Sequence, residues 1–286
     1  MSSFIERRLT KLAVKVLKHP KVQGAIADVV RKAVPSPDVT GEVHRVLSSP
    51  DMQRKLWHAA NVRPYDDAHA NDYAALRVGD IERTKYELAT RASAEFALRH
   101  CPDAPAYATP VELLKRCVEE ARALDGFFAE FGVYHGGTIN IISSLVPDRE
   151  VHGFDSFEGL PESWRDCGKG AFSTAGALPQ VGENVRLHVG WFDQTLLPFL
   201  DQVAAPAAFV HIDSDLYSSA KFVLNALRPR LVKGSVILFD EFFNYPSYEE
   251  HEYKAFFEFV EETRCRYTFL GYAARSFGAA VRIESI

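Results

Sequence analysis

Beyond about residue 109, short apolar runs alternate with helical patterns, and this alternation constrains the fold more than any other feature. The runs with strand character are 126–132, 150–154, 185–188, 207–212, 235–239, 267–272 and 279–283. Helical patterns separate most of them, and strands joined through a helix pair in parallel. The sequence therefore predicts an α/β fold with a doubly wound, mostly parallel sheet of seven strands. Ligands bind such sheets at the carboxyl ends of the strands.

The first hundred residues are helical in pattern and carry no chemical motif. Residues 4–17 have one apolar helical face and basic residues on the others, and residues 1–32 hold eight Lys/Arg against two acids. A basic amphipathic helix can lie on an anionic membrane surface or dock on a partner. We favour packing on its own domain or across a dimer. The predicted division is a helical N-terminal cap over 1–105 and an α/β domain over 106–286.

Bulk composition is that of an ordinary soluble globule, with 47% hydrophobic and 25% charged residues. The net charge of −5 gives no reason to expect a nucleic-acid partner. Four widely spaced cysteines without a CxxC pair favour free thiols in a reducing compartment. No apolar run approaches the roughly 20 residues that cross a bilayer, and no signal-peptide core is visible. We therefore expect a cytoplasmic protein without a transmembrane segment, and a homo-oligomer is left open.

Carboxylates follow two of the apolar runs at the point where each run ends. Asp213 and Asp215 come after one run, and Asp240 and Glu241 come after the next. Neighbouring strands lie about 4.8 Å apart, so the carboxylates of adjacent parallel strands converge at one edge of the sheet. Converging carboxylates raise one another's pKa unless a positive charge lies among them. A hard divalent cation with oxygen ligands is the simplest partner for such a group.

A second interpretation of these acids stays open. Asp is a good N-cap, so each acid could merely cap the helix that follows its strand. A single acid would favour the cap, whereas two converging pairs favour the cation. His211, two residues before Asp213, points to the same side of its strand. It is interpreted as an orienting or core histidine, and it is the next candidate for a base after Asp215.

A strand-to-helix turn follows the first apolar run and reads Glu130-Phe-Gly-Val-Tyr-His-Gly-Gly-Thr138. Gly132 can adopt backbone angles that other residues avoid. The amides of Gly136, Gly137 and Thr138 open a helix N-terminus, which attracts anions. Asp155, at the end of the next strand, is placed to accept hydrogen bonds from a ribose diol. The spacing G-x-x-x-G-G differs from the dinucleotide motif, so the turn favours a single nucleoside with a short charged tail.

Four stretches carry a more specific pattern: Glu130-Phe-Gly-Val-Tyr-His-Gly-Gly137, Gly153-Phe-Asp-Ser-Phe-Glu-Gly-Leu-Pro161, Gly190-Trp-Phe192 and His211-Ile-Asp-Ser-Asp-Leu-Tyr217. Together they resemble the macrocin O-methyltransferase family, over about residues 109–272. Members of that family are metal-dependent S-adenosylmethionine enzymes that methylate sugar hydroxyls in antibiotic biosynthesis. The resemblance implies that 106–286 is a Rossmann-like class I methyltransferase domain.

The resemblance also implies roles for single residues. The implied cofactor contacts are Glu130, Gly132, Tyr134, Gly136, Gly137, Thr138, Asp155, Ser156, Phe192 and Asp213. The implied ligands of Mg²⁺ or another divalent cation are Asp213, Asp240 and Glu241, and the implied general base is Asp215. Two positions depart from the family pattern. Glu241 stands where the family usually has Asp, and 194–198 reads Gln-Thr-Leu-Leu-Pro in place of Asp-Thr-Leu-Pro.

The predicted function is a metal-dependent transfer of a methyl group from S-adenosylmethionine to a hydroxyl of a sugar-bearing small molecule. A catechol-type O-methyltransferase is a rival, because a phenolic diol can use the same metal and fold. A non-catalytic binding protein built on the same sheet is a further alternative, although it has no need of converging carboxylates. The glycine spacing makes a nicotinamide dehydrogenase the least favoured reading.

Overall fold

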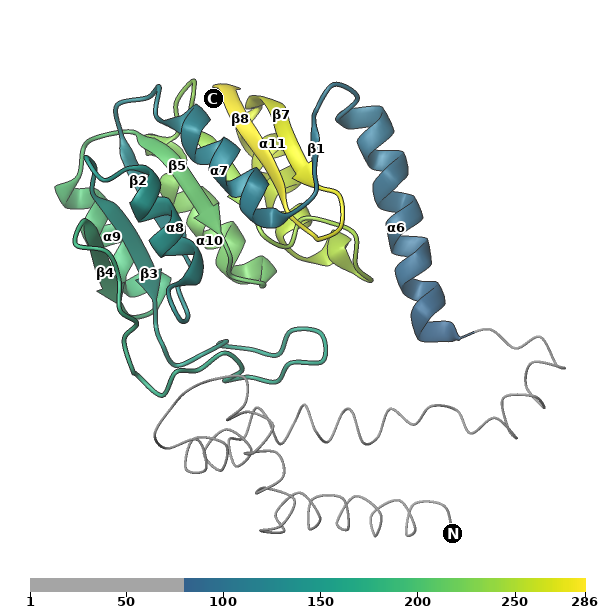
Figure 1. Ribbon diagram of the computed structural model, residues 1–286, viewed down its shortest axis with the longest axis horizontal. Coiled ribbons are helices and arrows are strands. Elements are labelled where there is room, and N and C mark those ends of the chain that lie inside the picture. The colour runs from purple at the N-terminus through teal and green to yellow at the C-terminus, as the bar shows by residue number, and fades with distance from the viewer. Residues whose placement is uncertain (1–79) are drawn as a thin grey trace, which may run out of the picture. The chain divides into compact units, whose positions relative to one another are not determined.

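The computed structural model describes residues 80–286, and it confirms the predicted α/β fold for this part of the chain (Figure 1). Its helices are α6 (Ile81–His100), α7 (Pro110–Ala121), α8 (Gly137–Leu145), α9 (Phe192–Gln202), α10 (Tyr217–Leu227) and α11 (Glu252–Thr263), with two short 3-10 helices, η1 (Arg228–Arg230) and η2 (Tyr248–Glu250). Its strands are β1 (Ala106–Tyr107), β2 (Phe127–Phe131), β3 (Val151–Asp155), β4 (Val185–Val189), β5 (Ala207–Ile212), β6 (Val236–Phe239), β7 (Arg266–Ala273) and β8 (Ala279–Ser285).

Internal contacts divide the chain into the units 1–79 and 80–286. The predicted basic helix at 4–17 and most of the predicted cap at 1–105 lie outside the described residues. Helix α6, the last part of that cap, packs within the second unit. Between residues 80 and 286, no helix is long and apolar enough to cross a bilayer.

The eight strands of the described part form one sheet in the order β1-β7-β8-β6-β5-β2-β3-β4. Strand β8 runs antiparallel to both β6 and β7, and the other pairs are parallel. All seven predicted strands are present, with ends that shift by at most two residues. The eighth is β1, whose two residues are too short to show a hydrophobic period.

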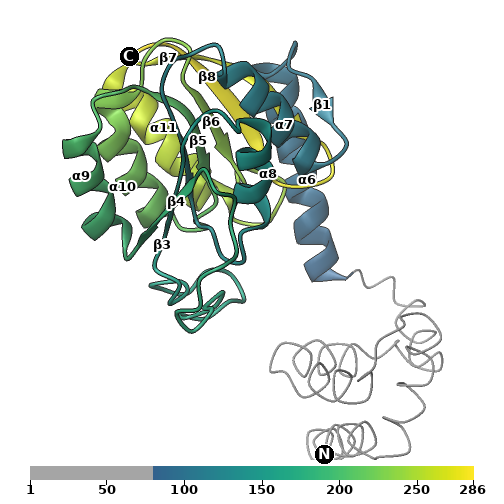
Figure 2. The same cartoon turned by 60° about the vertical axis from the view of Figure 1, so that its left-hand side comes forward.

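Helices cover both faces of the sheet (Figure 2): α9, α10 and α11 lie on one face, and α7 and α8 lie on the other. Each face has its own apolar core. Because side chains alternate along a strand, β2 sends Phe127, Ala129 and Phe131 into the first core and Phe128 into the second. Strands β2, β5 and β6 are buried along their whole length, as expected for central parallel strands.

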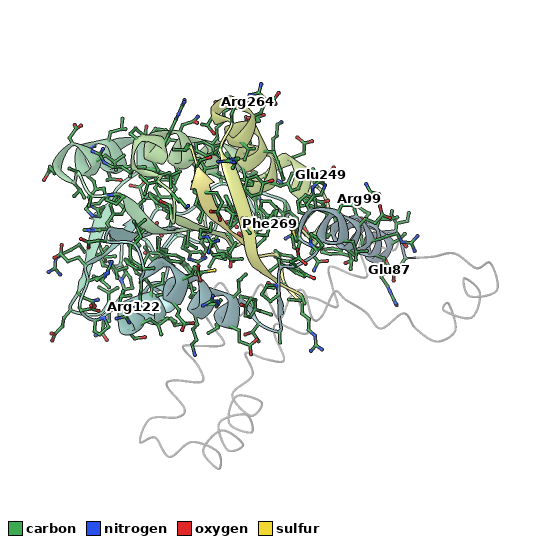
Figure 3. The ribbon with its side chains drawn as sticks, turned by 90° about the horizontal axis from the view of Figure 1, so that it is seen from above. Glu87, Arg99, Arg122, Glu249, Arg264 and Phe269 are labelled. Carbon is green, nitrogen blue, oxygen red and sulfur yellow. The ribbon has the colours of Figure 1, made fainter. Side chains whose placement is uncertain are left out.

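Helix α6 packs against the sheet unit through Phe96. The Phe96 ring is 9% exposed, and its centroid lies 5.6 Å from that of Tyr253 on α11 and 5.8 Å from that of Phe269 on β7. The charged residues Glu87 and Arg99 occupy exposed positions of the same helix, whereas Phe269 lies on β7 (Figure 3). Helix α6 is therefore part of the apolar core and not a detached appendage.

We expect Phe96→Ala to lower the free energy of unfolding of the protein by about 3 kcal/mol, the usual scale for removing a buried phenylalanine ring. Leu98→Ala on the same helix is the matched control, because Leu98 is 78% exposed. Its effect should stay within about 0.5 kcal/mol. Urea unfolding followed by circular dichroism measures both. Equal, small effects would show that α6 contributes nothing to the core.

Candidate active site

A cavity of about 610 Å³ opens beyond the carboxyl ends of the central strands. Eight of the predicted site residues line it: Gly132, Tyr134, Asp155, Ser156, Phe192, Asp213, Asp215 and Glu241. They follow β2, β3, β5 and β6 or begin α9, and they are brought together because these strands are neighbours in the sheet. This edge is where the sequence predicts the ligand site.

Gly132 allows two strand ends to approach each other closely. Its φ is +99°, and a Cβ atom at this position would lie 1.8 Å from the backbone oxygen of Asp213. No residue with a side chain fits there. Gly136 adopts a left-handed conformation, with φ +80°, as the N-cap of α8. The predicted glycine turn is thus set by direct backbone contact with the segment that carries Asp213.

Asp155 fastens the same turn to the end of β3. Its Oδ2 accepts hydrogen bonds from the backbone N–H groups of Val133 and Tyr134, both at 2.8 Å. Its Oδ1 accepts one from the N–H of Phe157 at 2.7 Å. A carboxylate has about four acceptor positions, so Asp155 keeps capacity for a ligand in the cavity that it lines. The sequence did not predict its role in holding the turn.

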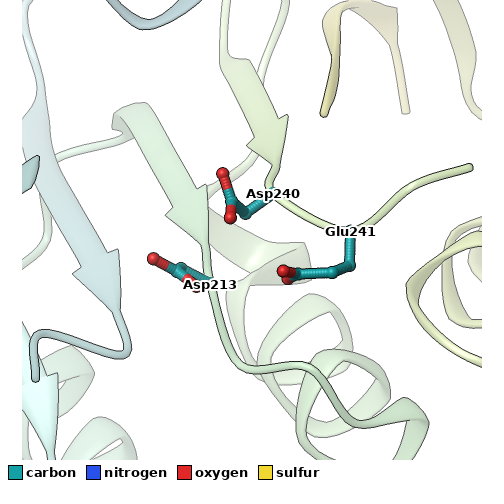
Figure 4. A group of neighbouring side chains, drawn as sticks. All are labelled: Asp213, Asp240 and Glu241. Atoms are coloured by element: carbon teal, nitrogen blue, oxygen red, sulfur yellow. The ribbon is translucent and has the colours of Figure 1, made fainter. Parts of the chain in front are cut away.

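Three carboxylates converge at the ends of β5 and β6. One oxygen from each of Asp213, Asp240 and Glu241 lies within 4.8 Å of the other two. Figure 4 shows the three side chains as near neighbours at the ends of two adjacent strands. Burial raises the pKa of Asp213 and of Glu241 well above its usual range, and the charge of Asp240 raises both further. Oε2 of Glu241 is buried and has no hydrogen-bond partner in the described part of the chain.

This arrangement fits a divalent cation better than it fits helix capping. The N-cap of α10 is Leu216, without a side-chain capping bond, so neither Asp213 nor Asp215 caps that helix. A hard cation with oxygen ligands would relieve the mutual repulsion and satisfy the unpartnered oxygen of Glu241. The donor set is therefore suited to magnesium.

Asp215 occupies a separate position in the cavity. Its backbone is left-handed, with φ +62°, and its side chain is 9% exposed. Burial and then the charge of Asp240 raise its pKa to about 7, while Arg165 acts in the opposite direction. A carboxylate with a pKa near neutrality is a stronger base than an ordinary aspartate and still loses its proton at physiological pH. Asp215 thus has the properties of a general base.

The three converging carboxylates of Asp213, Asp240 and Glu241 are called the acid group below. His211 precedes Asp213 by two residues and does not line the cavity. It is 1% exposed, and its Nδ1 lies 2.9 Å from Oε1 of the fully buried Glu130. Burial acts to lower the pKa of His211, but the hydrogen bond to Glu130 and the surrounding negative charges outweigh it and raise the pKa to about 9. The histidine therefore carries a positive charge near neutral pH, as an orienting residue would.

Glu252, the first residue of α11, is an acid that the sequence did not single out. It is fully buried, and its carboxylate accepts hydrogen bonds from the N–H groups of Ser214, at 3.4 Å, and Glu241, at 3.1 Å. Burial raises its pKa to about 8. Glu252 joins the two segments that carry the acid group. Its only signal in the sequence is an acidic helix start, which is common.

The long loop between β3 and β4 forms one wall of the cavity and is fastened at two points. Oγ of Ser218 on α10 donates a hydrogen bond to Glu162 at 2.6 Å. The Arg165 guanidinium donates one to the Tyr86 hydroxyl on α6 and lies 5.0 Å from the ring centroid of Trp164. These contacts join segments that lie far apart in the sequence, so no local pattern predicts them. Helix α6 thereby holds a wall of the cavity.

Five predicted site residues do not line the cavity: Glu130, Gly136, Gly137, Thr138 and Asp240. Asp240 nevertheless belongs to the acid group. The three residues from Gly136 to Thr138 form the start of α8. Glu130 is directed at His211 and away from solvent. Cys167 is half-buried and lies outside the cavity lining.

Comparison with protein families gives an independent finding. Residues 129–242 match a family profile described as a methyltransferase domain. This part of the chain is a methyltransferase domain. It contains every predicted cofactor, metal and base residue, from Glu130 to Glu241.

Two curated relatives are similar to part of this chain. Demethyldecarbamoylnovobiocin O-methyltransferase from Streptomyces niveus is 27% identical, over 53% of this chain and 68% of the relative. A tetracenomycin-C 4'-O-methyltransferase from Streptomyces olivaceus, named for its 8-demethyl-8-(2,3-dimethoxy-α-L-rhamnosyl) substrate, is 30% identical over 45% of this chain and 58% of the relative.

Among solved structures, the calicheamicin methyltransferase CalS11 matches with a TM-score of 0.51 and 23% identity, over 72% of this chain and 94% of that one. The O-methyltransferase NovP matches with a TM-score of 0.50 and 21% identity, over 62% and 79%. At these identities the likeness shows the fold, which is the Rossmann-like fold of methyltransferases.

Two kinds of residue line the cavity of the methyltransferase domain. Gly132, Asp155 and Phe192 could hold a nucleoside cofactor. The carboxylates Asp213, Asp215 and Glu241 line the same cavity, together with the loop residues Leu160 and Trp164. A cofactor and an acceptor bound in this cavity would lie close to a carboxylate base, which is the proximity that group transfer to a hydroxyl requires.

Proposed function

We propose that this chain, an S-adenosylmethionine-dependent O-methyltransferase, transfers a methyl group to a hydroxyl of a sugar or a glycosylated natural product. The matched domain and the two O-methyltransferase relatives support the reaction class. The name of the rhamnosyl tetracenomycin relative supports an acceptor that carries a sugar. Membership of the macrocin O-methyltransferase family, which the four sequence stretches indicate, is part of this proposal.

We also propose that Asp213, Asp240 and Glu241 bind a divalent cation, most simply magnesium. The observation that carries this proposal is the convergence of their three carboxylates within 4.8 Å, beside a cavity that also contains the cofactor turn. When bound, the cation would lower the pKa of an acceptor hydroxyl that it contacts. A sugar hydroxyl is a very weak acid, so this assistance matters more than it would for a phenol.

The residues of the chain then have distinct tasks. The turn around Gly132 and the carboxylate of Asp155 position S-adenosylmethionine, which supplies an activated methyl group on sulfur. Asp215 accepts the proton of the acceptor hydroxyl as that oxygen attacks the methyl carbon in line. A carbon–oxygen bond forms, the carbon–sulfur bond breaks, and the sulfur leaves as the neutral thioether of S-adenosylhomocysteine. The loop that carries Trp164 shields this end of the cavity from water.

A screen for S-adenosylhomocysteine release tests the acceptor class. We expect turnover, in the presence of magnesium, with sugar-bearing natural products. Turnover of simple catechols alone would favour the rival catechol-type activity, since both acceptors offer two adjacent oxygens. Absence of turnover with either class, in a protein that binds cofactor, would support the binding-protein alternative.

Cofactor binding provides a separate prediction. We expect isothermal titration calorimetry to detect binding of S-adenosylhomocysteine and none of NAD. Gly132→Ala should abolish that binding, because its Cβ would overlap the backbone oxygen of Asp213. Gly168→Ala is the matched control, since nothing lies within 4 Å of a Cβ atom there. Binding of NAD without a response to S-adenosylhomocysteine would contradict the cofactor assignment.

A further inference from the structure

Glu130, His211 and Asp240 form a row across three neighbouring strands. Glu130 on β2 is the register partner of His211 on β5, and His211 is the partner of Leu238 on β6. Side chains alternate along a strand, so Asp240, two residues after Leu238, extends from the same face as the other two. The row therefore ends in the acid group, to which Asp240 belongs.

The contacts along this row link Glu130 to His211 and His211 to Asp240. Nδ1 of His211 lies 2.9 Å from Oε1 of Glu130, with Glu130 and His211 0% and 1% exposed. Nε2 of the same ring lies 4.0 Å from Oδ1 of Asp240. A hydrogen bond between Nδ1 and a buried carboxylate fixes the orientation of the imidazole, and with it the position of the other ring nitrogen. Here that nitrogen faces Asp240, a carboxylate of the acid group.

Glu130 is also poorly placed to contact a cofactor. It is absent from the residues that line the cavity, although its neighbours Gly132 and Tyr134 line it. The resemblance to the macrocin O-methyltransferase family implies, in contrast, that Glu130 contacts the cofactor. The two roles predict different consequences when the carboxylate is removed.

We propose that Glu130 and His211 are a positioning pair, in which the buried carboxylate orients the imidazole and the imidazole orients the Asp240 carboxylate for the divalent cation. This inference rests on the proposed cation site. The pair acts through Asp240 and does not touch the reacting atoms. Outer residues that orient metal ligands in this way typically change metal affinity by about 10–100-fold.

The test compares Glu130→Gln with a matched control, Glu120→Gln. Glu120 on α7 is a partly buried glutamate that accepts a hydrogen bond from a basic side chain, Arg282 at 2.6 Å, but it lies outside the cavity. Calorimetry measures the affinities of the whole protein for Mn²⁺ and for S-adenosylhomocysteine. We expect Glu130→Gln to weaken Mn²⁺ binding at least about 10-fold and to leave cofactor binding within about twofold. Glu120→Gln should change neither affinity.

His211→Gln is the second variant and should reduce Mn²⁺ affinity to a similar extent. If the two residues act as a pair, the double variant will bind Mn²⁺ about as well as either single variant, because the second change removes nothing further. Circular dichroism confirms that each variant is folded. Should Glu130→Gln fail to fold, His211→Gln alone decides between the roles by the same two affinities.

Several results would overturn the inference. A loss of S-adenosylhomocysteine affinity with unchanged Mn²⁺ affinity would make Glu130 a cofactor contact. Unchanged values for both ligands, or equal losses for both, would leave the pair with a structural role only. If the unsubstituted protein binds no Mn²⁺, the proposed cation site itself fails, and this result is distinct because no variant is needed to see it.

Discussion

We expect Asp215→Asn to lower kcat by about 100-fold or more, the usual scale for the loss of a general base. The substitution keeps the size of the side chain, and Asn tolerates the left-handed backbone that residue 215 adopts, with φ +62°. Folding should therefore be retained. Because Asp215 lies outside the three converging carboxylates, the affinities for magnesium and S-adenosylhomocysteine should stay near those of the unsubstituted protein. Steady-state kinetics and calorimetry measure these quantities.

The control for this experiment is Asp166→Asn, an exposed aspartate in the loop that forms a wall of the cavity. It should leave kcat unchanged. Recovery of Asp215→Asn at high magnesium concentration would instead make Asp215 a cation ligand. The next candidate from the sequence, His211, is buried, does not line the cavity and already contacts Glu130. In that case the base must lie elsewhere.

We expect Asp213→Asn and Asp240→Asn to raise the magnesium concentration needed for half-maximal turnover by about 10-fold or more, because each removes one of the three proposed charged ligands. The same variants should be at least as stable as the unsubstituted protein in the presence of a chelator. Asp213 and Glu241 have raised pKa values, caused first by burial and then by the charge of Asp240. A neutral side chain at either aspartate removes part of that repulsion.

Thermal unfolding with and without magnesium measures both predicted effects, which are weaker magnesium binding and a stability in chelator that is at least that of the unsubstituted protein. A cation that binds only the folded state raises the melting temperature of the unsubstituted protein, and this rise should shrink in both variants. Glu241→Gln tests the third ligand, where the chain departs from its family pattern. An unchanged magnesium requirement in Glu241→Gln would reduce the site to two protein ligands. Lower stability of all three variants in chelator would show that the carboxylates are structural.

Much of the fold was determined by local sequence patterns. The apolar runs located seven strands, because a buried parallel strand is apolar along its length and short. The same reasoning located the acid group. Strands that are parallel neighbours end at one edge, so Asp213 and Asp240 had to approach each other once β5 and β6 paired. The glycine at 132 also had a local signal, since its positive φ excludes other residues.

Other features were decided only by tertiary structure. Strand β8 lies between β6 and β7 and antiparallel to both, an order that no local pattern encodes. Glu130 contacts a histidine 81 residues away, and Arg165 contacts a tyrosine 79 residues away. Glu252 accepts a hydrogen bond from the N–H of a residue 38 positions earlier. Each of these side chains has several possible partners when the chain is read alone. Which partner it meets depends on how the strands and helices pack, because burial leaves a charged group only the neighbours that the fold provides.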